Sequence, residues 1–303
     1  MQTTMKTADR GSEKPSEKTM LMREMKLPDI IPVVICFGLV ILLYRGVFHN
    51  WYDTWMAKES YYSHGVLVPF ISMFIIWLKR RRLMEARVEP AAVGYWLLVP
   101  SLLVYLVLTW AGGVQMQGLV FPMLIGGMVL ALFGREVGRV LRYPVGYLYF
   151  MCVLPGDVLT KLSFRIQMIS TACATQMLRG VGLEASREGA AIHLPNIDVM
   201  VGTPCSGFRM LISLFAFAVL LAYLKEGPWW GRASMVAITL PLSILLNSFR
   251  VMMIAMVGEN CGESAMHTFH DYSGYIVLGL AFIILSLYAR LVKCQKYNSK
   301  LIP

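Results

Sequence analysis

Long apolar segments recur along this chain of 303 residues and alternate with short polar ones. A helix needs about 20 mostly apolar residues to cross a hydrocarbon core of about 30 Å. Segments that reach or approach this length, the second and fifth being short, cover residues 28–48, 65–78, 93–111, 117–133, 143–155, 207–224, 233–257 and 272–289. The pattern predicts an all-α, polytopic membrane protein, a bundle of about eight transmembrane helices.

The polar ends of the chain set the expected domain limits. We expect a polar tail over 1–27, a single transmembrane domain over 28–290 and a second tail over 291–303. Residues 1–26 contain no apolar stretch that ends in a small-residue cleavage site. The first helix is therefore predicted to act as its own insertion signal.

Composition and charge agree with a membrane protein, since 57% of the residues are hydrophobic and 15% are charged. A net charge of +10 would suggest a nucleic-acid partner for a soluble protein. Here the basic residues cluster beside apolar segments, as they do at membrane boundaries. We expect the lipid bilayer as a partner and no nucleic acid.

The basic residues also predict the orientation, because cytoplasmic loops are enriched in Lys and Arg. With both termini in the cytoplasm, the inner segments carry 20 of the 28 Lys and Arg; these segments are 1–27, 79–92, 134–142, 225–232 and 290–303. Two more lie within predicted helices, and the outer side carries only Arg45, Lys58, Lys161, Arg165, Arg179 and Arg187.

The outer segment 156–204 is too long for a simple connection. Apolar residues spaced by three or four over 158–178 predict an amphipathic helix. Residues 184–201 alternate weakly and predict a short extended segment or hairpin. This insertion is expected to cover the outer face as a lid or to form a groove for a substrate.

The six cysteines, at positions 36, 152, 173, 205, 261 and 294, lack the spacing of a zinc site or a disulfide scaffold. We expect no metal and no cofactor. Cys205 and Cys261 both fall on the predicted outer side, so a disulfide between them stays open as an alternative.

Three places combine ionisable residues with apolar surroundings, and the topology puts all three on the outer side. Residues 203–209 open the sixth helix, where the amide hydrogens of the first turn and Arg209 favour a thiolate at Cys205. Arg250 follows Asn247 in the seventh helix, and an Arg at that depth is expected to face an anion or a developing oxyanion.

The third place is residues 267–274, where the eighth helix is expected to begin. His270 can act as a general base there, with Asp271 as a geometrically doubtful orienting carboxylate. Taken singly, a membrane cysteine is usually packing and a boundary histidine is usually only polar. Because three accidents would have no reason to share one face, the set predicts a nucleophile, a charge stabiliser and a base. His64 is a further candidate for the same site.

The chain resembles the exosortase and archaeosortase family of membrane cysteine transpeptidases. The resemblance rests on Cys205-Ser206-Gly207-Phe208-Arg209, Asn247-Ser248-Phe249-Arg250, His270-Asp271-Tyr272-Ser273-Gly274 and the early segment 63–69. It implies Cys205 as nucleophile, Arg250 as oxyanion or substrate stabiliser and His270 as acid and base. Ser206, Arg209, Asn247 and His64 are then supporting or substrate-binding residues. A histidine at position 270, where archaeal members have arginine, indicates a bacterial inner-membrane protein.

The resemblance also implies a substrate and a reaction. The substrate would be an exported protein with a C-terminal sorting signal: a short motif such as Pro-Glu-Pro, a transmembrane helix and a basic tail. Cleavage near the motif would give an acyl-enzyme, and transfer to a surface acceptor such as an exopolysaccharide would resolve it.

Two other hypotheses compete with this one. A transporter or polysaccharide-export component would require charges near the midplane and broken helices in paired halves, and the sequence has neither. An acyltransferase using a membrane histidine would leave Cys205 and Arg250 without roles.

Overall fold

The computed structural model describes residues 20–58, 60–202 and 205–298, so residues 1–19 of the first predicted tail and 299–303 of the second lie outside it. The described chain is mainly helical, which confirms the all-α membrane fold. The first part contains β1 (Met20–Leu21), α1 (Leu27–Leu43), α2 (Arg45–Met56), α3 (Leu67–Leu78), α4 (Arg80–Glu85), β2 (Arg87–Val88), α5 (Val93–Trp110) and α6 (Val114–Tyr147). The second contains α7 (Gly156–Gly180), β3 (Ser186–Glu188), β4 (Ala191–His193), β5 (Asp198–Met200), α8 (Phe208–Leu224), α9 (Trp229–Ala237), α10 (Thr239–Cys261) and α11 (Glu263–Leu291). Short 3-10 helices cover Met22–Glu24, Ser63–Val66 and Leu148–Met151.

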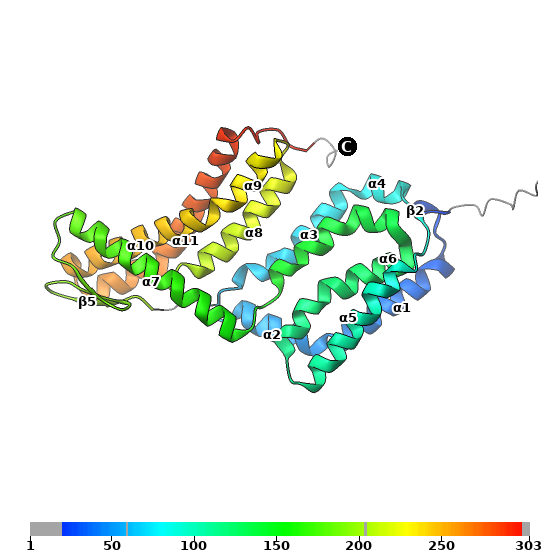
Figure 1. The fold of residues 1–303 in the computed structure, drawn as a ribbon, viewed down its shortest axis with the longest axis horizontal. Helices are drawn as coiled ribbons and strands as arrows, with labels where there is room; N and C mark the ends of the chain where they lie inside the picture. The colour runs from blue at the N-terminus through cyan, green and yellow to red at the C-terminus, as the bar shows by residue number, and fades with distance from the viewer. Residues whose placement is uncertain (1–19, 59, 203–204, 299–303) are drawn as a thin grey trace, which may run out of the picture.

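The helices form two halves, α1–α6 and α7–α11 (Figure 1). The first half has one hydrophobic core, built around side chains such as Trp51 and Leu124, and the second has two separate clusters. The halves meet along α6 and α8, where Tyr143 and Tyr147 donate hydrogen bonds to carbonyls of Val219 and Ala216. The tyrosine hydroxyls thus satisfy polar groups at an otherwise apolar contact.

Four continuous helical segments of the described chain are long and apolar enough to cross a membrane: Val93–Trp110, Val114–Met151, Trp229–Cys261 and Glu263–Leu291. The pair α1 and α2 qualifies as a fifth span if its 60° bend is accepted, and Ser63–Leu78 and Phe208–Leu224 are shorter apolar helices. All eight predicted apolar segments are mainly helical, so the bundle is confirmed while the count of eight spans stays a prediction.

Gly134 divides α6 into two helices. Its φ of 85° and ψ of −170° are non-helical and are accessible almost only to glycine. A Cβ at this position would meet the carbonyl of Glu89, whose amide in turn donates to Phe133. The predicted segments 117–133 and 143–155 therefore lie on opposite sides of this break, as expected from their separation in the sequence.

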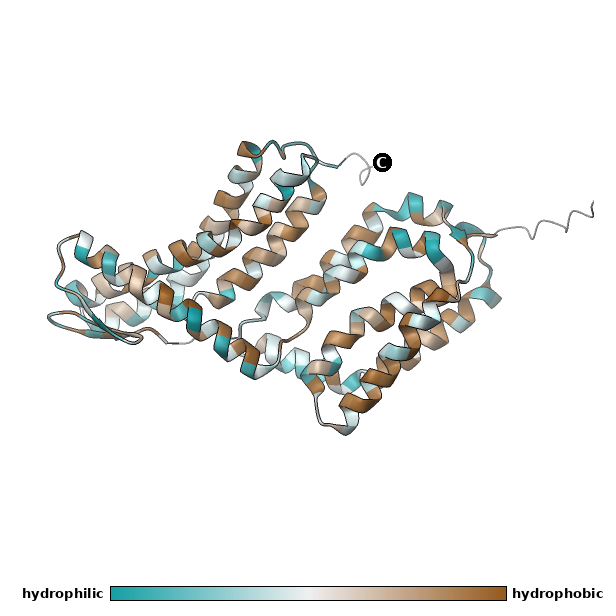
Figure 2. Ribbon diagram, in the orientation of Figure 1, coloured by the Kyte–Doolittle hydropathy of each residue, from teal (hydrophilic) through white to brown (hydrophobic). Residues whose placement is uncertain are grey.

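Exposed apolar side chains show which helices face lipid. None of the side chains of α1 is buried, and residues such as Val34 and Leu39 are more than half exposed. Trp96 and Trp110 of α5 are 82% and 92% exposed. Figure 2 shows apolar residues along these helices and polar residues on α4, α7 and the small sheet. Such surfaces are costly in water and normal in a bilayer.

Segments that are predicted to lie on the cytoplasmic side of the membrane contact one another. β1 pairs with β2, Lys79 donates to the carbonyl of Val140, and Lys225 forms an isolated bridge with Tyr297. In Figure 1, α4, α9 and the end of α11 lie along one edge of the molecule, opposite the connection between α5 and α6. The orientation of these segments across the membrane stays a prediction.

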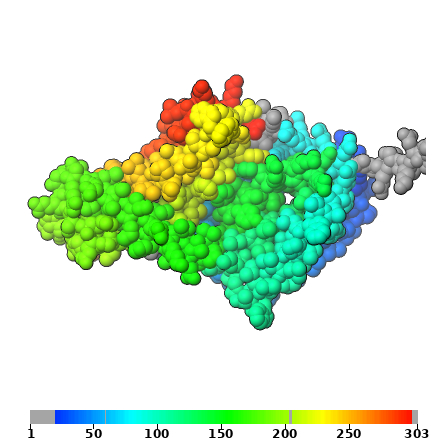
Figure 3. Space-filling model, viewed as in Figure 1, coloured from blue at the N-terminus to red at the C-terminus, as the bar shows by residue number. Residues whose placement is uncertain are grey.

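The insertion folds as a helix followed by a three-stranded antiparallel sheet in the order β3-β4-β5. Its helix, α7, extends over 156–180 and matches the predicted amphipathic helix, and the sheet matches the predicted extended segment. Space-filling Figure 3 shows this region projecting from one end of the molecule. One local expectation was wrong, because α11 begins at Glu263, one to two turns before the expected start.

We predict that Gly134→Ala lowers the free energy of unfolding by at least about 1 kcal/mol, because alanine at a positive φ is strained and its Cβ would meet Glu89. Gly146→Ala is the matched control in the same helix, where an added Cβ meets nothing within 4 Å. Thermal unfolding of both variants in detergent measures the difference. Equal melting temperatures would contradict the prediction.

Candidate active site

Cys205 lies in the turn that leads into α8. Its amide donates to the carbonyl of Gly202 at 2.9 Å, and its side chain is 8% exposed. Gly207 precedes the helix with φ +82°, and a Cβ there would lie 2.8 to 2.9 Å from atoms of the Asn247 side chain. Only glycine fits this position, because both the backbone angle and the close approach of α10 exclude a side chain. Thr203 and Pro204 of the predicted motif lie outside the described residues.

Hydrogen bonds to neighbouring helices fix this turn. Asn247 of α10, 1% exposed, donates its side-chain amide to the carbonyl of Cys205 at 2.8 Å. Ser206 is fully buried, and its Oγ accepts hydrogen bonds from Ser163 at 2.9 Å and from the amide of Phe208 at 3.3 Å. The hydroxyl of Tyr61 lies 2.9 Å from Ser163 Oγ. Three other segments of the chain therefore position the cysteine.

His270 contacts Cys205 directly. Its Nε2 lies 2.5 Å from Cys205 Sγ. The other ring nitrogen, Nδ1, lies 3.4 Å from a carboxylate oxygen of Asp271, whose side chain is 79% exposed. Because that contact is long and open to solvent, Asp271 orients the imidazole only weakly. The pair of thiol and imidazole has the geometry needed for proton transfer between them.

Arg250 joins α10 to α11 beside this pair. Its Nε donates to Ser273 Oγ and its Nη2 to the carbonyl of His270, both at 3.0 Å. Gly274 borders the guanidinium, since a Cβ there would lie 3.5 Å from Nη2, an ordinary van der Waals contact. Arg250 also interacts electrostatically with Cys205 and with Arg209. It thus places a positive charge near the sulfur and holds the backbone of His270.

Arg209 is half-buried in the first turn of α8. Its Nε and Nη2 atoms are buried and find no hydrogen-bond partner within the described chain. The structure therefore brings Cys205, Arg250 and His270 together and adds Arg209 to their electrostatic surroundings.

His64 lies apart from the cysteine. Its Nδ1 is 3.2 Å from Ser213 Oγ, about two turns along α8 from Cys205, and its ring stacks on Tyr62. His267 instead pairs with Glu263 at 3.6 Å on the exposed face of α11. Of these two histidines, His64 is the one that packs against the helix carrying the site, through Ser213.

All six cysteines are thiols, so Cys205 and Cys261 are not joined in this structure. Within the part of the chain that the structure describes, no group of three His, Cys, Asp or Glu side chains is arranged to hold a metal ion.

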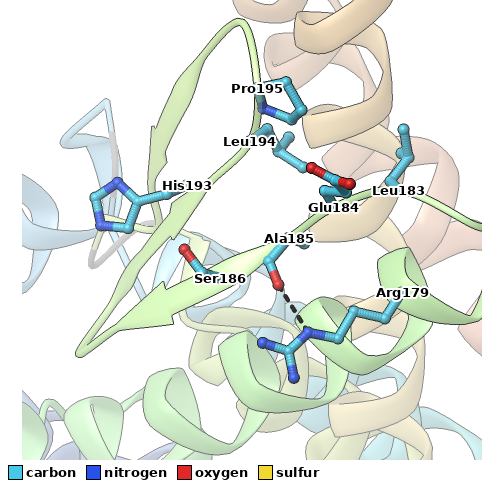
Figure 4. Close-up of a pocket in the computed structure, with 8 residues that line it drawn as sticks. All are labelled: Arg179, Leu183, Glu184, Ala185, Ser186, His193, Leu194 and Pro195. Carbon is cyan, nitrogen blue, oxygen red and sulfur yellow. Dashed lines mark hydrogen bonds between the residues drawn. The ribbon is translucent and has the colours of Figure 1, made fainter.

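Two cavities lie near the site without including the three central residues. One of about 450 Å³ lies between the end of α7 and the sheet, with Arg179 donating to the carbonyl of Ala185 and His193 pointing away from them (Figure 4). The other, of about 620 Å³, is lined almost wholly by apolar residues of both halves, including Leu154, Leu211 and Phe215.

Several residues of the site had no signal in the sequence. Ser163 lies on α7, where the spacing of apolar residues predicts a helix but does not say which helix it contacts. Tyr61 precedes the early segment 63–69, and its hydroxyl contacts Ser163 of a helix that is distant in the sequence. Ser273 belongs to the 270–274 motif, but its bond to Arg250 depends on how α10 crosses α11. All three act through contacts between distant segments.

Comparison with known proteins gives one match. The family model described as transmembrane exosortase matches residues 53–287, more than three quarters of the chain. No curated protein and no solved structure matches. The matched range includes every residue of the cluster described above.

We predict that Asn247→Ala lowers the free energy of unfolding by about 1–3 kcal/mol, because it leaves the carbonyl of Cys205 buried without its partner. Asn260→Ala is the control in the same helix, since Asn260 is exposed and bonds only to the carbonyl of Met256. Thermal unfolding, together with the rate of iodoacetamide labelling at Cys205, measures both effects. An Asn247 variant as stable as the Asn260 variant would refute this role.

Proposed function

The chain belongs to the transmembrane exosortase family, and from this premise we propose that it is a membrane cysteine peptidase or transpeptidase. Cys205 is the nucleophile, His270 the acid and base, and Arg250 the stabiliser of negative charge. The observation that carries the proposal is the 2.5 Å contact between Cys205 Sγ and His270 Nε2. A transporter would have no use for a nucleophile held against a base.

The reaction begins with transfer of the thiol proton to His270. The sulfur then attacks the carbonyl carbon of a substrate peptide bond and forms a C–S bond. When the C–N bond breaks, the leaving amine takes the proton from His270. This step leaves a thioester between Cys205 and the N-terminal part of the substrate.

A second nucleophile resolves the thioester. An amine of an acceptor, or water, gives its proton to His270 and attacks the same carbon. The C–S bond breaks, and the cysteine sulfur leaves with its electron pair and recovers the proton from His270. We propose a surface acceptor such as an exopolysaccharide component, because transfer keeps the exported protein at the cell surface.

Arg250 supports both steps. Negative charge develops on the carbonyl oxygen as the sulfur attacks, and a fixed guanidinium nearby lowers the energy of that state. Arg250 is held by Ser273 and by the carbonyl of His270, so its charge is fixed before the substrate arrives. The same two bonds tie the charge to the helix that carries the base.

The substrate is proposed to be an exported protein with a C-terminal sorting signal that ends in an apolar helix and a basic tail. The apolar cavity beside α8 supports this proposal, because Leu211 and Phe215 line it one to three turns along the helix from Cys205. An apolar helix packed there would bring the peptide that precedes it to the thiol. The proposed orientation puts this site on the outer face of the bacterial inner membrane.

We predict that Cys205→Ala reduces processing of a reporter bearing such a signal by at least about a thousandfold, because the thioester cannot form. Cys261→Ala is the matched control, an exposed cysteine at the end of α10, and it should retain activity. The mass of the reporter recovered from cells that express each variant measures processing. Unchanged processing by Cys205→Ala would refute the proposed function.

We predict that His270→Gln lowers the rate of processing by about a hundredfold or more, the usual range for loss of a general acid and base. His267→Gln serves as control, because His267 lies one turn away in the same helix and faces Glu263. The rates are measured on purified protein with the same reporter. If the His267 variant loses activity and the His270 variant keeps it, the assignment is wrong.

A further inference from the structure

Arg209 has hydrogen-bonding capacity that the described protein does not use. Its Nε and Nη2 are buried and have no partner within the described residues. Within those residues, every side chain that forms an ion pair with a carboxylate is a histidine, and Arg209 forms none. Buried guanidinium donors that lack partners lose the hydration they would have in water. Such a group is expected to gain its partners from a ligand.

Its surroundings favour an anion. Arg250 is close enough to interact electrostatically with Arg209, and the two like charges repel. The donors Nε and Nη2 of Arg250 are already engaged by Ser273 and by the carbonyl of His270. The thiolate form of Cys205 would offset one of the two positive charges, and the second would remain uncompensated. A second anion would therefore bind at Arg209.

We propose that Arg209 is a binding residue for a carboxylate side chain of the substrate, close to the peptide bond that Cys205 attacks. This inference rests on the proposed function. Arg209 follows Cys205 by four residues, one turn into α8, so the acidic residue it binds must lie within a few residues of the scissile bond. The planar guanidinium can present two parallel donors to a carboxylate.

The subsite would discriminate by charge. A glutamine or asparagine side chain has nearly the same shape as glutamate or aspartate but leaves Arg209 without a charged partner. Charge-assisted hydrogen bonds in a half-buried site are worth about a factor of ten or more each. The enzyme should thus prefer an acidic residue over its amide at one position of the substrate.

The first test uses pairs of small thiol reagents, each pair consisting of one anionic and one neutral reagent. Iodoacetate and iodoacetamide both form an S–C bond with the cysteine and release iodide, but only iodoacetate is a carboxylate. The 2-carboxyethyl and 2-hydroxyethyl methanethiosulfonates form an S–S bond, release methanesulfinate and reach further from the sulfur. Mass spectrometry of the full chain in detergent gives the rate at each cysteine. The ratio of anionic to neutral rates removes the effect of thiolate concentration.

We expect that Arg209→Gln lowers this ratio at Cys205 by about tenfold for at least one reagent pair, while Arg209→Lys keeps most of it. Exposed Cys261 is the internal reference, and its ratio should not change. Slow labelling of buried Cys152 and Cys294 shows that each variant is folded. Arg187→Gln, on the exposed β3 strand, controls for a general loss of positive charge.

Several outcomes would overturn the inference. One is a ratio that is the same in Arg209→Gln and in the unaltered protein for both reagent pairs. Another is an equal loss in Arg187→Gln. A third is a preference abolished by phosphatidylglycerol nanodiscs but kept in phosphatidylcholine nanodiscs, which would assign Arg209 to a lipid phosphate.

The second test uses the reporter. Each acidic residue in the ten positions before its apolar helix is changed to the amide, Glu→Gln or Asp→Asn, one at a time. One such change should slow processing by the unaltered enzyme about tenfold and have no further effect in Arg209→Gln. If the reporter is processed but no single change behaves in this way, the inference fails and the proposed function stands. Absence of processing by the unaltered enzyme would instead count against the proposed function.

Discussion

The position of the thiol depends on one helix, α10, and on two of its side chains. Asn247 bonds to the carbonyl of Cys205, and Arg250 bonds to the carbonyl of His270. The two residues are three positions apart and so lie on neighbouring parts of the same helical face. Helix α10 is thus hydrogen-bonded both to the turn before α8 and to α11. These bonds set the distance between the sulfur of Cys205 and the imidazole of His270. Neither Cys205 nor His270 has to be placed by its own helix alone.

The cost of polar groups in a membrane explains why so many small contacts surround this site. A buried hydroxyl or amide in an apolar environment is unfavourable unless it is hydrogen-bonded. Ser163, Ser206 and Asn247 are each at most 1% exposed, and each forms a bond to the turn or within it. Each of these polar groups serves as the hydrogen-bond partner of another, so the loss of one leaves a buried group without its hydrogen bond. Arg209 departs from this pattern at Nε and Nη2, which have no hydrogen-bond partner within the described residues.

Much of the fold could be predicted because lipid imposes a simple rule on the sequence. Helices that face lipid must be apolar over their length, so hydropathy locates α1, α5 and α10 well. The periodicity of 158–178 likewise identifies α7. The break at Gly134 was less visible, because a glycine in a helical segment does not reveal whether the chain bends there. That depends on Glu89, which packs against it from another part of the chain.

The candidate site likewise contains some residues that can be predicted from the sequence and others that cannot. Cys205, Arg250 and His270 stand out because charged or reactive groups are rare in apolar segments. The partners that hold them, Ser163 and Ser273, are ordinary residues whose role depends on which helices cross. The predicted start of the eighth helix lies after the observed start of α11, because residues 263–271 include many polar residues and resemble a loop. They are helical since α11 packs there on α10, whose contacts cannot be derived from hydropathy.

The packing around Cys205 bears on whether the insertion over residues 156–204 acts as a lid or forms a groove. Cys205 belongs to a hydrophobic cluster with Leu178 of α7, Ile192 of the sheet and Ala255 of α10. Leu178 and Ile192 are fully buried in it. A lid that opened would expose these side chains and remove the packing on one side of the thiol. The insertion is therefore part of the core that holds the cysteine, and any movement of it as a lid would have to break this packing.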